Sequence, residues 1–151
     1  MRAVIQRVRE ASVAVEGKVV GAIGPGLLVF VGIESADTEE DRAWLANKLV
    51  ALRVFEDEAG QMNRSLAETG GGILLISQFT LYGSLRKGTR PSFNRAAPAE
   101  WAREFYGQFH RELEAVLGKA VPTGVFGAMM EIRAAHDGPV TLVVDTKQKE
   151  F

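Results

Sequence analysis

Residues 73–81 read ILLISQFTL, and the change of character within this stretch organises the rest of the chain. The aliphatic run 73–76 follows a glycine triplet and is typical of a buried strand that begins after a loop. Backbone N–H groups come free of the hydrogen-bond ladder where such a strand ends, so donors and side chains there can face a ligand together. The alternative is a strand that continues, with its hydroxyl groups bonded within the sheet. The candidate site residues at this strand end are Ser77, Gln78, Phe79 and Thr80.

Composition places the chain among ordinary globular proteins and excludes several kinds of site. Its 151 residues are 46% hydrophobic and 25% charged, which predicts one domain over residues 1–151 with a core that needs no disulfide. The chain has no cysteine and only two histidines, His110 and His136, in unrelated contexts. We therefore expect no metal site and no cofactor.

Hydropathy and net charge indicate where the protein is located and what it binds. The N-terminus does not resemble a signal peptide, and no apolar run approaches the roughly 20 residues of a membrane span. These features predict a cytoplasmic protein with no membrane partner. The net charge of −1 argues against a protein that coats nucleic acid without specificity.

One segment, residues 83–97, is nevertheless basic. At about 15 residues it is longer than most connections between elements, which hints at a function. Cations and aromatic rings together suit the end of a single-stranded nucleic acid, with charge for phosphate and rings for base stacking. The alternative is a solvated surface loop. The residues concerned are Arg86, Lys87, Arg90 and Arg95, interleaved with Tyr82 and Phe93.

The order of periodic segments predicts the fold class. Strand patterns precede a helix whose N-terminus at Thr38 resembles a capping box, and a second helix follows Pro98 and ends at Gly118. No regular alternation of strand and helix appears. We therefore expect an α+β fold, in which two main helices pack on one side of a mixed or antiparallel, barrel-like, layered sheet. The expected strands are 3–8, a hairpin over 12–23, 27–33, 53–56, 73–76, 123–132 and 140–144.

Two further places in the sequence are unusual. Arg7 falls on the apolar face of the first strand, either as an edge residue that reaches water or as an inward arginine that holds a carbonyl or carboxylate. Gly138-Pro139 reads as a turn between two strands, and the dipeptide alone does not reveal its isomer. We expect His110 and His136 to be polar surface residues, although His136 is also a candidate base.

Two pentapeptides are informative when they are considered together. SQFTL at 77–81 and DGPVT at 137–141, in this order and spacing, resemble the D-aminoacyl-tRNA deacylases. The resemblance extends along nearly the whole chain. Further matching segments are AVIQRV at 3–8, ASVAVEG at 11–17, RVFED at 53–57, MNRSL at 62–66, RPSF at 90–93 and TGVF at 123–126.

The resemblance implies an esterase that removes D-amino acids, and mischarged glycine, from tRNA. It implies a homodimer in which a cis Gly138-Pro139 loop of one subunit enters the partner's pocket, captures the substrate ammonium and excludes L side chains. Arg7 would steady this loop. Ser77 to Thr80 would form the catalytic wall, and Phe126 and Met129 would line the pocket. The tRNA contacts would come from Arg86, Lys87 and Arg90. One departure is His136, where the family usually has asparagine.

The chemistry expected from these residues needs no strong nucleophile. An aminoacyl ester is already activated, so backbone N–H donors near Gln78 and Phe79 would suffice to stabilise the oxyanion, and the resemblance implies help from the tRNA 2′-hydroxyl. Thr80 as a covalent nucleophile lacks an adjacent base in the sequence. Two other classes remain open: a noncatalytic nucleic-acid-binding module that uses residues 83–97, and a Ser or Thr hydrolase of small esters.

Overall fold

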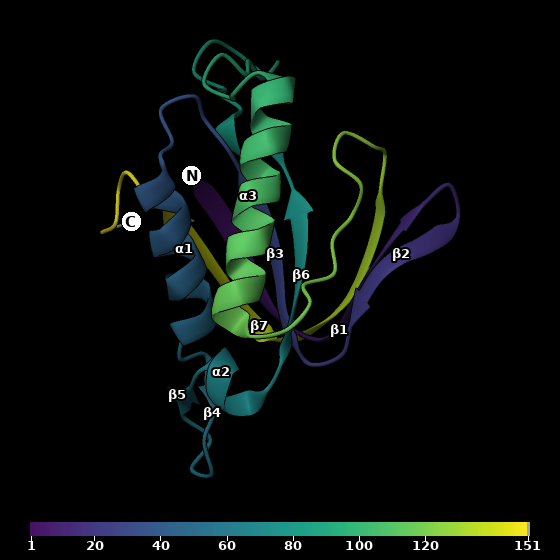
Figure 1. The fold of residues 1–151 in the computed structure, drawn as a ribbon, viewed down its shortest axis with the longest axis vertical. Helices are drawn as coiled ribbons and strands as arrows, with labels where there is room; N and C mark the ends of the chain where they lie inside the picture. Colours follow the sequence, from purple (N-terminus) through teal and green to yellow (C-terminus); the bar gives the residue numbers. More distant parts are fainter. Residues whose placement is uncertain (151) are drawn as a thin grey trace.

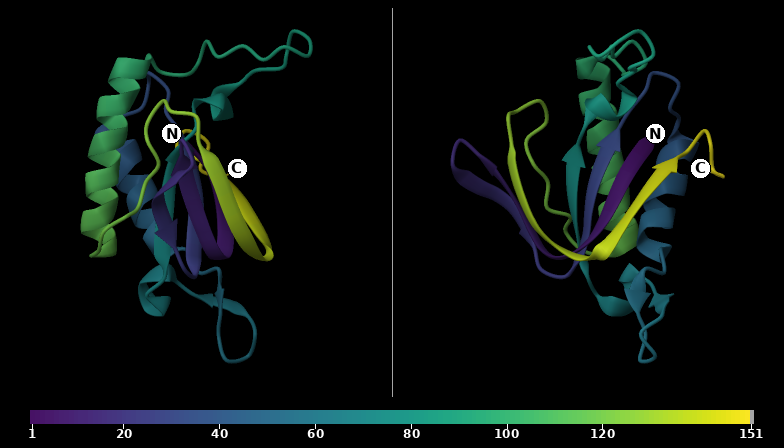
Figure 2. Two further views of the ribbon diagram at one scale, coloured as in Figure 1. Left: turned by 90° about the vertical axis from the view of Figure 1, so that its right-hand side faces the viewer. Right: turned by 180° about the vertical axis from the view of Figure 1, so that it is seen from behind.

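The structure of the chain, a computed structural model, describes residues 1–150. Its centre is a curled, mixed β-sheet, with helices α1 (Glu39–Ala51) and α3 (Ala99–Leu117) packed on one face (Figure 1). The side view in Figure 2 separates this helical layer from the sheet. The predicted α+β class, with two main helices on one side of a mixed sheet, is confirmed. The strands of the sheet are β1 (Arg2–Val15), β2 (Lys18–Ile23), β3 (Gly26–Gly32), β6 (Gly72–Ser77) and β7 (Glu131–Asp145).

β1 is the central strand because it pairs antiparallel with β2, β3 and β7. The β3–β6 pair is parallel, and its register places Gly26 opposite Gly72 and Val31 opposite Ser77. A Cβ atom on Gly26 would lie 2.0 Å from the carbonyl oxygen of Gly72, so only glycine permits this approach. The parallel pairing carries the carboxyl end of β6 to the same edge of the sheet as the end of β3.

The helices begin and end at sequence signals. At the start of α1, the Thr38 hydroxyl accepts from the Asp41 N–H and the Asp41 carboxylate accepts from the Thr38 N–H, which is the predicted capping box. Gly118, at φ 77°, ends α3 and donates to the Glu114 carbonyl. The two helices pack on each other and on the sheet through buried apolar residues. These include Leu45, Leu49, Ile73, Leu75, Phe109 and Leu113.

Three short elements complete the described chain. A small hairpin follows α1, a single-turn helix precedes β6, and a 3₁₀ helix follows it. These are β4 (Phe55–Glu56), β5 (Met62–Arg64), α2 (Leu66–Thr69) and η1 (Phe79–Tyr82). Within residues 1–150, no helix combines the length and apolar character needed to cross a membrane.

The strand predicted over residues 123–132 is wrong. Thr123 makes an isolated bridge to Leu75, and the chain then runs as a loop with a turn until β7 begins at Glu131. Gly127 has φ 78°, which breaks the extended conformation. The apolar side chains of this segment gave it a strand-like pattern, but several of them line a pocket instead of a sheet.

Three other local predictions also need correction. Gly138-Pro139 does not connect two strands; it lies inside the continuous strand β7, where the register with β1 jumps between Val8 and Gln6. Arg7 of β1 there lies opposite four residues of β7, 137–140, so this segment leaves the ladder as a loop, which tolerates a residue without a backbone donor. His110 is half-buried and not a free surface residue, and its Nε2 lies 2.8 Å from the Val121 carbonyl oxygen. The strand expected over 53–56 is shorter, and covers only Phe55–Glu56.

Candidate active site

The strand end singled out in the sequence is where β6 stops. Ser77 is its last residue, and Gln78 donates its N–H to the Val31 carbonyl at 2.7 Å before the chain turns into η1. The Gln78 N–H is therefore not the free donor that we expected. Within residues 1–150, the N–H groups of Phe79 and Thr80 donate to no other group. A pair of adjacent free donors thus begins two residues after the end of the strand.

Thr80 is exposed, and its hydroxyl accepts a hydrogen bond from the side-chain amide of Gln78. An amide nitrogen cannot take up a proton, so this contact does not make the hydroxyl a nucleophile. The strand does not continue through these residues, because Thr80 belongs to the 3₁₀ helix η1.

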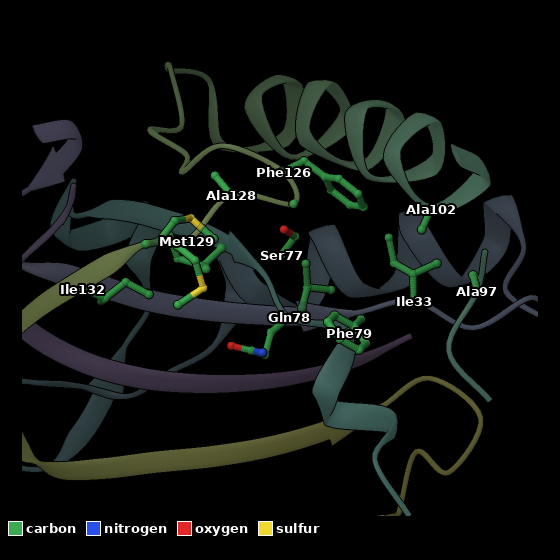
Figure 3. A pocket seen from close by; sticks show the side chains of 14 residues that line it. Ile33, Ser77, Gln78, Phe79, Ala97, Ala102, Phe126, Ala128, Met129 and Ile132 are labelled. Carbon is green, nitrogen blue, oxygen red and sulfur yellow. The ribbon is translucent and has the colours of Figure 1, made fainter. Parts of the chain in front are cut away.

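A pocket of about 350 Å³ opens beside this strand end. Ser77, Gln78 and Phe79 form one wall, and Phe126 and Met129 of the 123–130 loop form the other, as Figure 3 shows. The pocket is mostly apolar. Further lining residues come from β3 and its extension, from the start of α3 and from the start of β7: Val31, Ile33, Ala97, Ala102 and Ile132.

Phe126 is held in its wall by helix α3. Its ring lies 5.8 Å from the ring of Tyr106, and the guanidinium of Arg103 lies over it at 5.0 Å. The Tyr106 hydroxyl donates to the Leu75 carbonyl of β6 at 3.1 Å, and burial raises the pKa of this phenol. The far wall is therefore fixed to the same strand that carries Ser77. Met129 is 91% exposed and lies at the rim.

Gly138 and Pro139 do not line this pocket of their own chain. Their peptide bond is cis, both residues are exposed, and Gly138 has φ 151°. A Cβ atom on Gly138 would lie 2.4 Å from the Val140 nitrogen, so the local backbone requires glycine.

Arg7 is an inward arginine, and the alternative of an edge residue that reaches water is wrong. It is 5% exposed, and its guanidinium donates to the Asp137 carbonyl at 2.9 Å and to the Val54 carbonyl at 2.6 Å. The Asp137 carboxylate lies 3.3 Å from the same guanidinium. Arg7 therefore contacts the residue that immediately precedes Gly138.

The basic segment lies next to the pocket wall. Arg86, Lys87 and Arg90 are exposed, and none of them forms a salt bridge within residues 1–150. Arg95 differs, because it pairs with Glu34 at 3.0 Å. The rings of Phe93 and Phe79 meet edge to face, with 5.0 Å between their centroids. The segment thus contacts the residue that bears one of the free N–H groups.

The structure gives no candidate for a resident metal among residues 1–150, where no group of three or more carboxylate or histidine side chains gathers. His136 is exposed on β7, and Val8 is its partner in the β1 register. It is not one of the pocket residues. The described site therefore offers backbone donors and an apolar cavity, with no titratable side chain bonded to Thr80.

Comparison with known proteins decides the family. The family model described as D-Tyr-tRNA(Tyr) deacylase matches residues 4–145. A protein of Dechloromonas aromatica named D-aminoacyl-tRNA deacylase is 56% identical over 150 residues, which cover 99% of this chain and 100% of that protein. One of Thermus aquaticus with the same name is 55% identical and covers 99% of this chain and 97% of its own length. The chain belongs to the D-aminoacyl-tRNA deacylase family. The resemblance seen in the sequence is confirmed.

Solved structures agree with the deacylase fold. One, named c-Myc DNA Unwinding Element Binding Protein, superposes with a TM-score of 0.91 at 40% identity and covers 96% of this chain and 98% of its own. Another, described as a probable eukaryotic D-amino acid tRNA deacylase, has a TM-score of 0.83 at 21% identity over 94% of this chain and 97% of its own. Because the second structure is only 21% identical in sequence, its similarity shows the fold alone.

Several site features of this deacylase were missed by sequence reasoning. The N–H of Thr80 replaces that of Gln78 as a free donor, and Ala97 and Ala102 help to line the pocket. Small residues just before a helix and in its first turn look like ordinary packing positions, so nothing in the sequence marks them. The lining by Phe126 and Met129 was expected from the resemblance, and both residues border the pocket.

Proposed function

We propose that this chain hydrolyses the ester bond of D-aminoacyl-tRNA, and of mischarged glycyl-tRNA, to release free amino acid and tRNA. The observation that carries the proposal is the pair of N–H groups of Phe79 and Thr80, which have no partner among residues 1–150; Phe79 lines the pocket and Thr80 is the next residue. Membership of the deacylase family supports the substrate class.

In the proposed reaction, water attacks the ester carbonyl carbon and a tetrahedral oxyanion forms. The Phe79 and Thr80 N–H groups donate to this oxyanion, and removal of one such donor costs about 10²–10³ in kcat in other hydrolases. Collapse of the intermediate breaks the bond to the 3′-oxygen of the tRNA, which leaves with a proton. The neighbouring 2′-hydroxyl of the substrate assists the attacking water, so the protein need not supply a side-chain base.

Chirality is enforced by a second copy of the chain. Gly138 and Pro139 lie outside the pocket of their own subunit and are exposed, which supports a role in the pocket of a partner. There the loop presents carbonyl oxygens to the substrate ammonium, and an L side chain collides with it. Arg7 holds the loop through the Asp137 carbonyl. On this proposal the working unit is a homodimer.

The tRNA backbone is held by Arg86, Lys87 and Arg90, which are exposed on the segment that contacts the pocket wall through the Phe93–Phe79 ring pair. Phosphate contacts of this kind orient a nucleic acid without reading its sequence. Since the substrate is aminoacylated tRNA, we place the reaction in the cytoplasm.

The decisive experiment compares D- and L-tyrosyl-tRNA, prepared on the same tRNA, as substrates of the purified chain. We expect rapid hydrolysis of the D-ester and no enzymatic hydrolysis of the L-ester, with glycyl-tRNA cleaved as well. Equal rates on the two enantiomers would contradict the proposal. Specific activity measured across a dilution series should fall in parallel with the dimer fraction determined by sedimentation. Activity that persists in a monomeric sample would refute the shared site.

A second candidate function is noncatalytic nucleic-acid binding. The basic segment and the likeness to a structure named as a DNA unwinding element binding protein favour it. This candidate predicts affinity for unacylated RNA or DNA without ester turnover. Turnover of D-tyrosyl-tRNA by the chain would exclude it as the whole function.

A further inference from the structure

Tyr82, the last residue of η1, lies in an unusual cationic environment. It is 2% exposed, and two guanidinium groups lie over its ring, that of Arg2 at 4.9 Å and that of Arg95 at 5.3 Å from the ring centroid. A cation over a desolvated aromatic ring is attracted by the negative charge of the ring face. We call these three residues the Arg2–Tyr82–Arg95 cluster.

Each guanidinium of the cluster is fixed by a carboxylate. Arg2 donates to Asp145 at 3.1 and 2.9 Å, and Arg95 donates to Glu34 at distances between 3.0 and 3.3 Å. Asp145 is the last residue of β7 and Glu34 follows β3, and both are buried. Because more than one hydrogen bond joins each guanidinium to its carboxylate, the orientation of each arginine side chain is restricted. The cluster is therefore tied to two strands of the sheet.

Arg2 also bonds the backbone of η1 directly, because its Nη1 donates to the Leu81 carbonyl at 2.9 Å. On the side of β3, a Cβ atom on Gly32 would lie 3.0 Å from the Gln78 carbonyl oxygen and 3.2 Å from the Tyr82 ring. The 3₁₀ helix thus packs closely against β3. It is also held by the Arg2 guanidinium, whose own position is fixed by Asp145 of β7.

We propose that the Arg2–Tyr82–Arg95 cluster positions η1 for catalysis, so that Arg2 and Arg95 act as positioning residues for the oxyanion donors. Phe79 and Thr80 are the first two residues of η1, and the direction of their N–H groups follows the placement of this helix. Figure 3 shows Gln78 and Phe79 where the chain passes from the pocket wall into the helix. The inference rests on the proposed deacylase function.

The cluster has a second consequence for the basic segment. Tyr82 directly precedes residues 83–97 and Arg95 lies near their end, so the cluster closes the base of this segment. Backbone bonds between Ser84 and Ser92 and from the Ala97 N–H to the Ile33 carbonyl complete the closure. The Arg2–Tyr82–Arg95 cluster therefore supports both the segment that we propose binds tRNA and the N–H groups that we propose donate to the oxyanion.

The test variant is Arg2→Lys. An ammonium retains the charge but cannot pair with Asp145, donate to the Leu81 carbonyl and cover the ring at once. A displacement of about 1 Å in a catalytic group costs up to about 10² in rate. We therefore expect kcat on D-tyrosyl-tRNA to fall by about tenfold to a hundredfold. We expect KM to stay within about twofold, because the substrate contacts themselves remain.

The matched control is Arg53→Lys. Arg53 also donates to a backbone carbonyl and a side-chain oxygen, both of Asn63, but it lies by the β4–β5 hairpin. This variant should keep the wild-type kcat and KM. If Arg2→Lys melts earlier but keeps kcat within twofold of wild type well below its melting temperature, the cluster is only structural and the proposal is overturned.

A readout without turnover separates this proposal from the proposed function. In ¹⁵N-labelled protein, the heteronuclear NOE of the Phe79 and Thr80 amides should fall in Arg2→Lys and stay unchanged in Arg53→Lys. This measurement decides the positioning role even if the wild-type chain cleaves no ester. Should Arg2→Lys fail to fold, Arg95→Gln replaces it, since the Arg95 side chain is 57% exposed. Unchanged NOE values in the folded variant would overturn the proposal.

Discussion

The guanidinium of Arg7 donates a 2.9 Å hydrogen bond to the carbonyl of Asp137, a residue 130 positions away that directly precedes Gly138. A second bond, at 2.6 Å, goes to the Val54 carbonyl before β4. One buried side chain on the central strand thus joins the segment before the small hairpin to the loop over 137–140 in β7. The planar fork of arginine suits this task, because it directs several donors at separate acceptors.

Arg7→Ala should loosen chiral selection. The Asp137 carbonyl loses its donor, so the loop shifts, and we expect the D-over-L rate ratio to fall by about tenfold, equivalent to about 1.4 kcal/mol. Stability should fall as well, by about 1–3 kcal/mol for each buried carbonyl left unpaired. The control is Arg9→Ala, because Arg9 approaches the Asp137 carboxylate at 3.7 Å but is 77% exposed. A D-over-L ratio equal to that of wild type in Arg7→Ala would contradict the assigned role.

Gly138→Ala should impair turnover more than folding. The added Cβ would lie 2.4 Å from the Val140 nitrogen, which forces the exposed loop to move. A shift of about 1 Å corresponds to a loss of up to about 10² in kcat/KM. Gly24→Ala is the matched control, because nothing lies within 4 Å of its added Cβ. Wild-type kcat/KM in Gly138→Ala would show that the loop does not act in catalysis.

Thr80→Ala should keep substantial activity. The Thr80 hydroxyl is bonded to the Gln78 amide, which cannot act as a base, while the Thr80 N–H remains available after the substitution. We expect kcat to fall by less than about tenfold, well below the effect of losing a nucleophile. Mass spectrometry of enzyme quenched during turnover should detect no acyl group on Thr80. Abolished turnover in a folded variant, or an acyl adduct, would restore the covalent mechanism.

Neutralisation of Arg86, Lys87 and Arg90 to glutamine should raise the KM for tRNA and flatten its salt dependence. Removal of each phosphate-binding cation reduces the slope of log affinity against log salt by about 0.7 for a single strand. The control changes three other exposed cations, Lys18, Arg64 and Lys119, to glutamine. Equal salt slopes in the two triple variants would identify the segment as solvated surface.

The two tyrosines of the chain should make the fold sensitive to alkali. Burial raises the pKa of both Tyr82 and Tyr106, and nearby carboxylates add to the effect at Tyr82. Above pH ~10 the unfolded chain loses phenol protons that the folded chain retains, so stability falls as pH rises, by up to about 1.4 kcal/mol per pH unit for each phenol. Urea unfolding measured across this range should show that Tyr106→Phe halves the slope. Tyrosinate absorbance in the folded protein near pH 10 would contradict this.

Interactions between residues close together in the sequence determine much of the fold, and the sequence alone reveals them. The capping box at Thr38, the left-handed cap at Gly118 and the apolar run 73–76 act over a few residues, and each element formed where the sequence predicted it. The end of β6 at Ser77 was predicted for the same reason, since polar residues replace aliphatic ones there. The predicted strand over 123–132 failed because an apolar pattern does not say whether side chains face a sheet or a pocket.

Only the tertiary structure decided which groups meet. It assigned the Gln78 N–H to the Val31 carbonyl, left those of Phe79 and Thr80 without a partner among residues 1–150, and brought Arg7 to Asp137 across 130 residues. It also placed Gly138-Pro139 inside a strand and away from the pocket of its own chain. Contacts between distant segments depend on strand register and bulges, and a shift of one residue in register turns every side chain to the other face. The sequence therefore determined which residues are candidates for the proposed chemistry, while the packing of the sheet determined which of their atoms are available for it.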